Sequence, residues 1–449
     1  MAVIVNVDPV TRIEGHLAVK VKVEGGVVEE AWSSGLLWRG LEKIVVGRDP
    51  RDAPVILGRI CGVCHNIHHL VSAMAVERAA GITLEDLPVN AVALRNIIQA
   101  ASTMYSHLVH LSVLAGPDYD MYGLGMENYY KLLKETILPA QRICNQIIAL
   151  FGGKAPHTEA LVPGGVATVL TVDKAVSALA KLKELESYVG KLIPTIQEYL
   201  DSHPEFLDFG VGCGNFLSYE CYPDPQQPGK PVFRNLVKIK GEVKPLDPGK
   251  IIEYVASSWY SEASAGKPWE APPPEDRYGK PGAYSWIKSP RYEGEPCETG
   301  PLARMTLAGY YKPKSKHGAS LYDRMYARAA EVVLLLEKMP EWVFSLKPGG
   351  EVWLPFTVPD FGEGSAFWEA PRGSNAHWVT IRGGKIERYQ VVSPSAWNLS
   401  PRDGSGKPGP VEQALVGTPV PDTSNPVNVV RVVRSFDPCL ACACHLVEG

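Results

Sequence analysis

Apolar and polar residues alternate at the start of the chain, over residues 3–7 and again over residues 16–24, and Gly25 and Gly26 follow the second run. Alternation with a period of two gives a strand one face for the core and one for solvent. Paired glycines suit the tight turn between two such strands. The pattern therefore predicts an antiparallel hairpin within residues 1–50.

Beyond residue 50 the apolar positions recur every three to four residues, which is the period of an amphipathic helix. Glycine or proline marks the ends of several of these segments. A shorter helix is expected over residues 425–435, because Pro426 suits a first helical turn. The longer predicted helices cover residues 66–80, 89–114, 129–151 with a kink near Pro139, 173–200 and 321–338.

Two regions depart from this helical pattern. Alternation returns over residues 351–392 and predicts further β-structure. Residues 266–301 are rich in Pro and Gly and could form a linker between domains, but the interleaved Trp269, Tyr278, Tyr284 and Trp286 favour a loop packed on the protein surface.

Composition narrows the class of protein. The 449 residues are 45% hydrophobic and 21% charged, with a formal net charge of −4, which is typical of a soluble globular protein and not of a nucleic-acid binder. The sequence has no apolar run of about eighteen residues, and the apolar start is too short for a signal peptide. We expect no direct membrane span and no targeting signal, so the chain would be cytoplasmic or carried to the membrane or periplasm by a partner.

The nine cysteines do not resemble a disulfide framework, because they are odd in number and spread through a long chain. Cys61 and Cys64 form one Cys-x-x-Cys pair, and Cys439 and Cys442 form another. Gly62 permits a tight turn within the first pair, and Cys64 falls at a helix start, where free amides favour the thiolate. Two pairs could complete one site, but their spacing leaves zinc, an iron-sulfur cluster and a catalytic metal open.

Other histidines and cysteines show weaker signals. His68 follows Cys64 by four residues, so both would project from one helix face. We interpret His65 and His69 as ordinary polar helix residues. The isolated cysteines are expected to be buried, inert thiols: Cys144, Cys213, Cys221 and Cys297. Cys444 is an extra thiol without an assigned role.

The segments around the paired cysteines carry a resemblance. Residues 59–64 (RICGVC) with His68, and residues 437–445 (DPCLACACH), closely resemble the two signature motifs of the large subunit of nickel-iron hydrogenases, nearest in motifs to the uptake-type group. Further family-like segments follow in the family order at residues 11–16 (TRIEGH), 39–42 (RGLE), 298–305 (ETGPLARM), 369–373 (EAPRG) and 394–398 (PSAWN).

Because these segments run from one end of the chain to the other, the resemblance implies a single domain over residues 1–449. We expect an α+β fold, a mostly helical large domain with a central long-helix bundle and peripheral antiparallel β-segments. Its parts would be an N-terminal β-ribbon (1–50), a helical core (54–204), a loop-rich insertion (205–320) and a helix and β-rich C-terminal part (321–449).

The resemblance also implies a nickel-iron centre that cleaves or forms H2, with carbon monoxide and cyanide on the iron. Cys61 and Cys439 would be terminal nickel ligands, and Cys64 and Cys442 would bridge nickel and iron, in keeping with the preference of such metals for soft thiolates. Glu14 would accept the proton from a terminal thiolate. Without the resemblance, Glu14 would be interpreted as a surface charge on the β-ribbon.

The family pattern assigns supporting roles as well. Arg372 and Ser395 would lie near the cyanides of the iron, where hydrogen-bond donors hold anionic ligands. Asp118 and Asp437 would pair with Arg372 or order water near it, although a helix-end role competes for Asp118. His68 would donate a hydrogen bond to a bridging sulfur.

A second ion is expected near the C-terminus. Glu42, the backbone carbonyl of Val391, and His445 match the family positions that hold magnesium or another divalent ion, a hard cation that prefers oxygen ligands. Only residues 446–449 follow His445, whereas family precursors usually carry a longer tail that a protease removes. Two alternatives remain: this member skips that step, or its tail is vestigial.

Electrons need a route, and no further cysteine cluster in the sequence could hold one. The resemblance therefore implies an iron-sulfur small subunit, with the aromatic loop as one candidate contact, together with maturation factors and in some cases a larger electron-transfer complex. The alternatives are a structural zinc protein, a subunit of a related quinone reductase, which usually lacks these cysteines, and a hydrogen-sensing regulatory subunit. Val63 favours turnover over sensing, because sensors tend to have a bulkier residue there.

Overall fold

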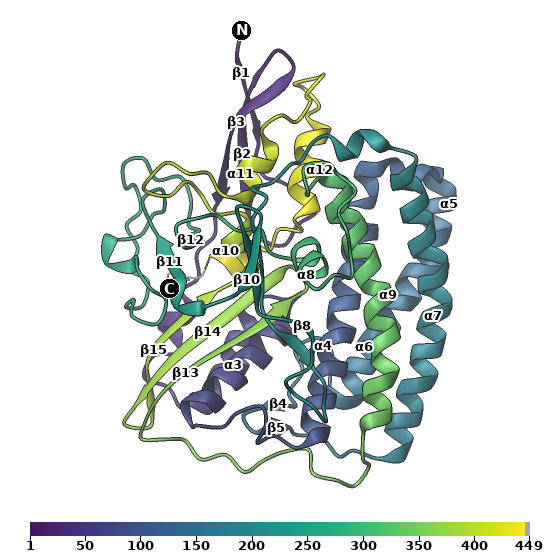
Figure 1. The fold of residues 1–449 in the computed structure, drawn as a ribbon, viewed down its shortest axis with the longest axis vertical. Helices are drawn as coiled ribbons and strands as arrows, with labels where there is room; N and C mark the ends of the chain where they lie inside the picture. Colours follow the sequence, from purple (N-terminus) through teal and green to yellow (C-terminus); the bar gives the residue numbers. More distant parts are fainter. Residues whose placement is uncertain (445–449) are drawn as a thin grey trace.

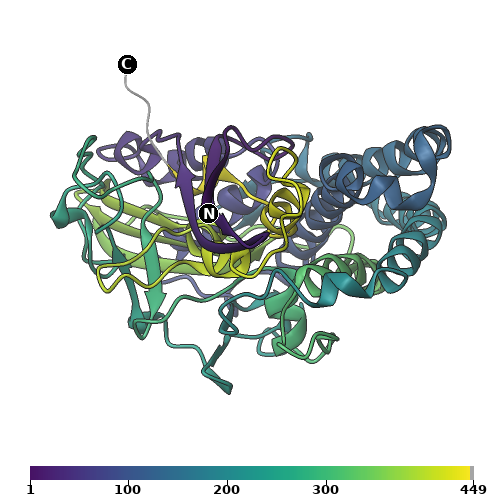
Figure 2. The same cartoon turned by 90° about the horizontal axis from the view of Figure 1, so that it is seen from above.

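The computed structural model describes residues 1–444. A bundle of long helices stands beside a three-stranded sheet, and a narrow ribbon that holds the N-terminus rises above both (Figure 1). Seen from above, the first strands and the last helices project onto the middle of the molecule, where the sheet meets the bundle (Figure 2). The expected α+β fold is confirmed: one large domain with long helices and small antiparallel sheets.

The N-terminal ribbon is an antiparallel sheet in the order β1-β2-β3. Alternate residues of β2 are buried, as the period-two pattern requires. The predicted hairpin is present, and a third strand that the sequence did not single out extends it. The strands are β1 Val3–Val7, β2 Leu17–Glu24 and β3 Val27–Gly35.

The predicted helices are present, with changes at their ends. The kink expected near Pro139 is a π-helical turn, η5 Leu133–Ile137, between α5 and α6, just before the proline that cannot donate a backbone hydrogen bond. The expected end of the helix at residue 338 was wrong, because α9 continues past Pro340 to Ser345. The long helices are α3 His65–Ala79, α4 Val89–Val109, α5 Gly125–Leu132, α6 Leu138–Gly152, α7 Val172–Asp201 and α9 Leu321–Ser345.

A sheet in the order β13-β14-β15 packs one face on α3. Gly364 of β13 permits this contact, because a Cβ at that position would lie 2.1 Å from the carbonyl oxygen of Ala75. The β-structure that the sequence predicted over residues 351–392 is present, but its first strand begins at residue 361. The strands are β13 Phe361–Ala370, β14 Gly373–Arg382 and β15 Lys385–Val392.

Short strands occupy the region between α6 and α8, so the expected loop-rich insertion contains several two- and three-stranded sheets. Its aromatic loop packs as expected, since Trp286 stacks on Trp38 with ring centroids 4.9 Å apart. The strands are β4 Leu161–Val162, β5 Gly165–Val166, β6 Phe216–Ser218, β7 Cys221–Pro223, β8 Pro231–Phe233, β9 Leu236–Ile239, β10 Glu242–Pro245, β11 Ile251–Tyr254 and β12 Ser289–Tyr292.

Short helices surround the two cysteine pairs, and the predicted helix over residues 425–435 is α12, with Pro426 as its N-cap. Among residues 1–444, no helix is both long and apolar enough to cross a bilayer. The short helices are α1 Leu41–Ile44, α2 Ala53–Leu57, α8 Pro301–Leu307, α10 Pro394–Asn398, α11 Pro410–Leu415, α12 Val427–Ser435 and α13 Leu440–Ala443.

Candidate metal centre

The two cysteine pairs meet in one buried cluster. The Sγ atoms of Cys61 and Cys439 are 3.4 Å apart, those of Cys64 and Cys442 are 3.1 Å apart, and all four lie within 4.8 Å of one another. None of these cysteines is in a disulfide, and all four are buried. Four soft donors gathered around one point are suited to soft or borderline metal ions.

Local structure explains how each pair is aimed. Cys64 is the N-cap of α3, so its sulfur lies where the helix begins, as the sequence predicted. Cys439 is the N-cap of the short helix α13 and follows Asp437, which adopts a left-handed backbone conformation with φ 54°. Arg39 ties the two segments together, because its guanidinium donates to the carbonyl of Ile60 and, at 2.9 Å, to the carbonyl of Ala441.

The N-terminal ribbon leads into a loop that lies against the second pair. The amide of Glu14 donates to the carbonyl of Pro438, and the amide of Leu440 donates to the carbonyl of Glu14 at 2.8 Å. Gly15, with φ +82°, permits this approach, because a Cβ there would be 2.7 Å from the Cβ of Leu440. The loop over residues 11–16 therefore forms one wall of the site.

The cluster cannot hold four thiolates without a cation. Burial raises the pKa of Cys439 and that of Cys442 well above the usual thiol value. Burial would also raise the pKa of Cys61, but hydrogen bonds from the other three thiols and the charge of Arg372 lower it well below its usual value. The first proton therefore leaves readily, and loss of the others requires a bound metal.

Glu14 lies beside a sulfur that was predicted to be a terminal ligand. Its Oε2 accepts from the thiol of Cys439 at 3.1 Å and from the amide of Ala441 at 3.0 Å. Burial, followed by the negative charge of Cys61, raises the pKa of Glu14 above that of an ordinary glutamate. The sequence placed Glu14 beside a terminal cysteine, and this contact agrees with it.

Arg372 and Asp437 form a buried ion pair, with Nη2 and Oδ1 3.1 Å apart, as predicted. The Nη2 contact with Asp437 does not have hydrogen-bond geometry, and Nε and Nη1 make no hydrogen bond to another atom of residues 1–444. Buried donors without acceptors are rare, so this side chain is suited to an anionic group in the site. Ser395 is also adjacent, since its hydroxyl oxygen accepts from the amide of Cys439 at 2.9 Å.

The structure places two predicted residues differently. The Nδ1 of His68 contacts the Nε2 of His377 at 3.1 Å, and its Nε2 has no hydrogen-bond partner within residues 1–444, so the expected hydrogen bond to a bridging sulfur is not made. Asp118 pairs with Arg12 and Arg434 instead of with Arg372, because its position at the start of η4 (Gly116–Gly123) faces the N-terminal loop.

Around Glu42, buried charges surround a cavity of about 20 Å³ that Val391 also lines, large enough for one water-sized occupant. Burial raises the pKa of Glu42 to about 8. Glu253 and Lys288, which the sequence did not single out, line the same cavity and form an ion pair at 3.2 Å. His445, the remaining predicted ligand, lies outside the described residues.

Sequence reasoning missed Arg39 and His377 as contacts of the site. Arg39 stands in a segment that resembled the family, but nothing in the sequence indicated that it bonds both cysteine segments. His377 lies in β14, far along the chain from its partner His68, and no spacing rule links the two. Cys144, Cys221, Cys297 and Cys444 are buried as free thiols, whereas Cys213 is partly exposed.

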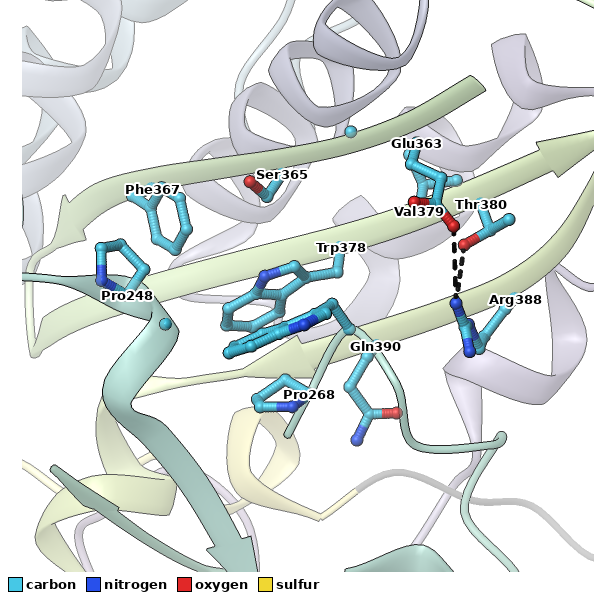
Figure 3. Close-up of a pocket in the computed structure, with 13 residues that line it drawn as sticks. Pro248, Pro268, Glu363, Ser365, Phe367, Trp378, Val379, Thr380, Arg388 and Gln390 are labelled. Atoms are coloured by element: carbon cyan, nitrogen blue, oxygen red, sulfur yellow. Dashed lines mark hydrogen bonds and ion pairs between the residues drawn. The ribbon is translucent and has the colours of Figure 1, made fainter. Parts of the chain in front are cut away.

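A larger cavity lies elsewhere, on the face of the β13-β14-β15 sheet opposite α3. It measures about 320 Å³, and Trp269, Phe367 and Trp378 form its aromatic walls. In Figure 3, Arg388 turns toward Thr380 and Glu363, and its guanidinium lies 3.2 Å from the Thr380 hydroxyl. None of the four clustered cysteines lines this cavity, so it is separate from the metal-binding cluster.

Comparison with known proteins decides between the metals that cysteine spacing left open. A family model described as nickel-dependent hydrogenase matches residues 39–122 and 126–445, and a model described as HoxL-like matches residues 4–32. The periplasmic NiFeSe hydrogenase large subunit of Desulfomicrobium baculatum is 35% identical, over 99% of this chain and 95% of that protein. The Hydrogenase-2 large chain of Escherichia coli K12 is 33% identical, over 99% and 97%.

Solved structures agree with the sequence comparisons. The as-isolated oxidized Ni-Fe-Se hydrogenase from D. vulgaris Hildenborough matches with a TM-score of 0.94 at 36% identity, over 99% of this chain and 100% of that chain. Among the sequence relatives, an uptake hydrogenase large subunit of Bradyrhizobium diazoefficiens is also similar, at 32% identity over 98% of this chain. Together with the four clustered sulfurs, these matches show that the chain is a catalytic large subunit of the nickel-dependent hydrogenase family.

Proposed function

We propose that Cys61 and Cys439 are terminal ligands of nickel, that Cys64 and Cys442 bridge nickel and iron, and that Glu14 receives the proton of H2. The observation that carries this proposal is the 3.1 Å contact between the Sγ of Cys439 and Oε2 of Glu14 inside a cluster of four sulfurs. When bound, the nickel-iron centre supplies the heterolytic cleavage of H2, or its reverse, and electrons pass to an iron-sulfur partner subunit.

The chain's own residues then move the proton. The Sγ of Cys439 holds it first, and Oε2 of Glu14 takes it over the hydrogen bond that already joins them. The amide of Ala441 fixes the carboxylate in this orientation. Because burial raises the pKa of Glu14, its carboxyl group is better matched to accepting and releasing a proton near neutral pH.

Arg372 is the proposed holder of the small anionic ligands of the iron. Apart from the ion pair of Nη2 with Asp437, its guanidinium nitrogens have no acceptor within residues 1–444, and the cyanides of the iron would supply acceptors. Ser395 lies beside Cys439 and offers a hydroxyl group to the same region. An infrared spectrum of the purified enzyme should show the stretching bands of carbon monoxide and cyanide, and their absence would contradict this part.

The cavity beside Glu42 is the proposed site of magnesium or another divalent ion. A carboxylate and the Val391 carbonyl are oxygen donors of the kind that hard cations prefer, and His445 would complete the set. A cation would offset the cost of burying the Glu42 charge, which otherwise keeps its carboxyl group protonated to about pH 8. Metal analysis after exchange into metal-free buffer should find about one such ion per chain.

The proposed partner is the iron-sulfur small subunit, as in other enzymes built from such a large subunit. Within residues 1–444, the only group of three or more cysteine, histidine, aspartate or glutamate side chains close enough to share a metal is the cluster already described. This chain therefore has no second site for an electron carrier in that part. Copurification of a subunit that contains iron and sulfide would support the partnership.

The test replaces Glu14 by glutamine, which keeps the shape of the side chain and removes its ability to carry the proton. The exchange of D2 with solvent protons should fall by roughly 100-fold or more, the usual range for losing a proton-transfer group. Nickel and iron contents should match those of the wild-type enzyme. Glu24→Gln, on an exposed end of β2, is the matched control and should keep full exchange. Wild-type exchange rates in Glu14→Gln would refute the assignment.

A further inference from the structure

Asp118 binds two arginines that come from opposite ends of the chain. Its Oδ1 pairs with Nη2 of Arg12, and its Oδ2 pairs with Nη1 of Arg434. The carboxylate and Arg434 are buried, whereas Arg12 is about one-third exposed. The mechanism assigned above to Glu14 and Arg372 does not use this group.

Both arginines hold the loop that carries Glu14. Arg434 donates from Nε to the carbonyl of Thr11 at 2.9 Å and from Nη2 to the Thr11 hydroxyl at 3.3 Å. Arg12 donates from Nη1 to the carbonyl of Leu114 at 2.6 Å. Asp118 is therefore the common acceptor of two side chains that fix the backbone of residues 11 and 12.

The loop needs such anchoring. Arg12 has φ 55°, a left-handed conformation that is strained for a residue with a side chain. Two residues further on, the carboxylate of Glu14 must stay within hydrogen-bond distance of Cys439. Released from Asp118, the loop could relax toward ordinary backbone angles and carry the carboxylate away from the thiol.

The same aspartate also fixes the other side of that contact. Arg434 lies in the last turn of α12, just before the segment that leads to Cys439. Arg431, one helical turn earlier, donates from Nε to the backbone carbonyl of Asp118. One carboxylate thus links the segment with the proton acceptor to the segment with the thiol that donates to it.

We infer that Asp118 is a positioning residue for proton transfer, which sets Glu14 against Cys439 through Arg12 and Arg434. This inference rests on the role proposed for Glu14. It differs from the sequence-based expectation, in which Asp118 would act on Arg372. A shift of about 1 Å in a reacting group can reduce a rate by about 100-fold, so a loosened loop has a measurable effect.

The test uses the whole enzyme with its partner subunit and compares Asp118→Asn with Asp120→Asn, an exposed neighbour on the same η4 segment. In Asp118→Asn, D2 exchange per nickel should fall by roughly 100-fold. Backbone amides of residues 11–16 should exchange with deuterated solvent about tenfold faster, since their opening is no longer restrained. Asp120→Asn should match wild type in both measurements.

A second variant covers a failure of Asp118→Asn to fold or to bind nickel. Arg12→Gln removes the more exposed of the two arginines that bind Asp118, and this variant should show slower D2 exchange at full nickel content. If Arg12 and Arg434 act only through Asp118, D2 exchange in the double variant Arg12→Gln, Asp118→Asn should be no slower than in Asp118→Asn alone.

The outcomes separate this inference from the proposed function. Loss of D2 exchange in Glu14→Gln together with wild-type exchange in Asp118→Asn or in Arg12→Gln would overturn the inference alone. Retained exchange in Glu14→Gln would refute the proposed function and the inference with it. A lower melting temperature with unchanged exchange per nickel would show that Asp118 only stabilises the fold, which would also overturn the inference.

Discussion

Glu412 should make the enzyme less stable as the pH rises from about 4.5 to about 7, and Glu412→Gln should remove this effect. Its carboxylate is buried and accepts from the amide of Ser33 at 3.0 Å and from the hydroxyl of Tyr284 at 2.8 Å. Arg402 approaches its other oxygen at 3.5 Å. The residue thus joins the N-terminal ribbon, the aromatic loop and α11, and it is not part of the metal site.

The magnitude follows from the pKa. Burial raises the pKa of Glu412 to about 7 from the usual glutamate value of about 4.5. Below about pH 4.5 the group is protonated in both the folded and the unfolded chain and contributes nothing. Between these two pKa values only the unfolded chain releases the proton, so the free energy of unfolding falls by about 1.4 kcal/mol per pH unit. Above pH 7 the accumulated loss is on the order of 3 kcal/mol.

Ser33 and Tyr284 both donate to Oε1 of Glu412, and glutamine keeps this acceptor oxygen but does not titrate. Calorimetry of wild type and Glu412→Gln at pH 5 and pH 8 should therefore show a difference that appears mainly at pH 8. With an unfolding entropy near 2.1 cal/mol/K per residue over 449 residues, 3 kcal/mol corresponds to about 3 °C in favour of the variant. A variant that is equally stabilised at both pH values, or destabilised more at pH 8, would refute the reasoning.

Two further substitutions test the packing around the site. Arg304→Met should lower the free energy of unfolding by about 3–5 kcal/mol in denaturant, because it leaves the buried carboxylates of Glu331 and Glu369 without their shared cation. Adding Glu331→Gln should recover part of this loss. A neutral effect of Arg304→Met would contradict the argument. Gly15→Ala should lower both the rate of D2 exchange and the melting temperature, because the backbone has φ +82° and a Cβ there would lie 2.7 Å from the Cβ of Leu440. An unchanged exchange rate would mean that the loop adapts without moving Glu14.

Local sequence patterns predicted most helices, because burial with a period of 3.6 is visible in any window of a dozen residues. The main error was the end of α9, which was predicted at residue 338 and lies at Ser345. Pro340 removes one backbone hydrogen bond, yet Trp342 and Val343 are buried against the core and hold the last turns in helical form. Tertiary packing decides such a boundary, and the sequence alone does not show it.

The cysteine cluster was predictable because the ligands themselves form a short, repeated motif. Long-range contacts between polar residues elsewhere in the fold were not predictable in this way. Glu412 meets Ser33 across nearly the whole chain, and Arg304 meets Glu369 from another family-like segment. Asp118 was expected to pair with Arg372 or to order water near it, whereas it binds Arg12 and Arg434, and no motif or spacing in the sequence links it to those two arginines.

Glu14, the proposed proton acceptor, also supports the second cysteine pair, and the two roles use different atoms. The backbone of Glu14 pairs with Pro438 and Leu440, whereas its side chain bonds the thiol of Cys439 and the amide of Ala441. A change confined to the carboxylate leaves the backbone bridge intact, so the metal site can assemble while proton transfer fails. Changes at Gly15 or Asp118 act on the backbone path instead, which is why the two kinds of variant should differ in amide exchange over residues 11–16.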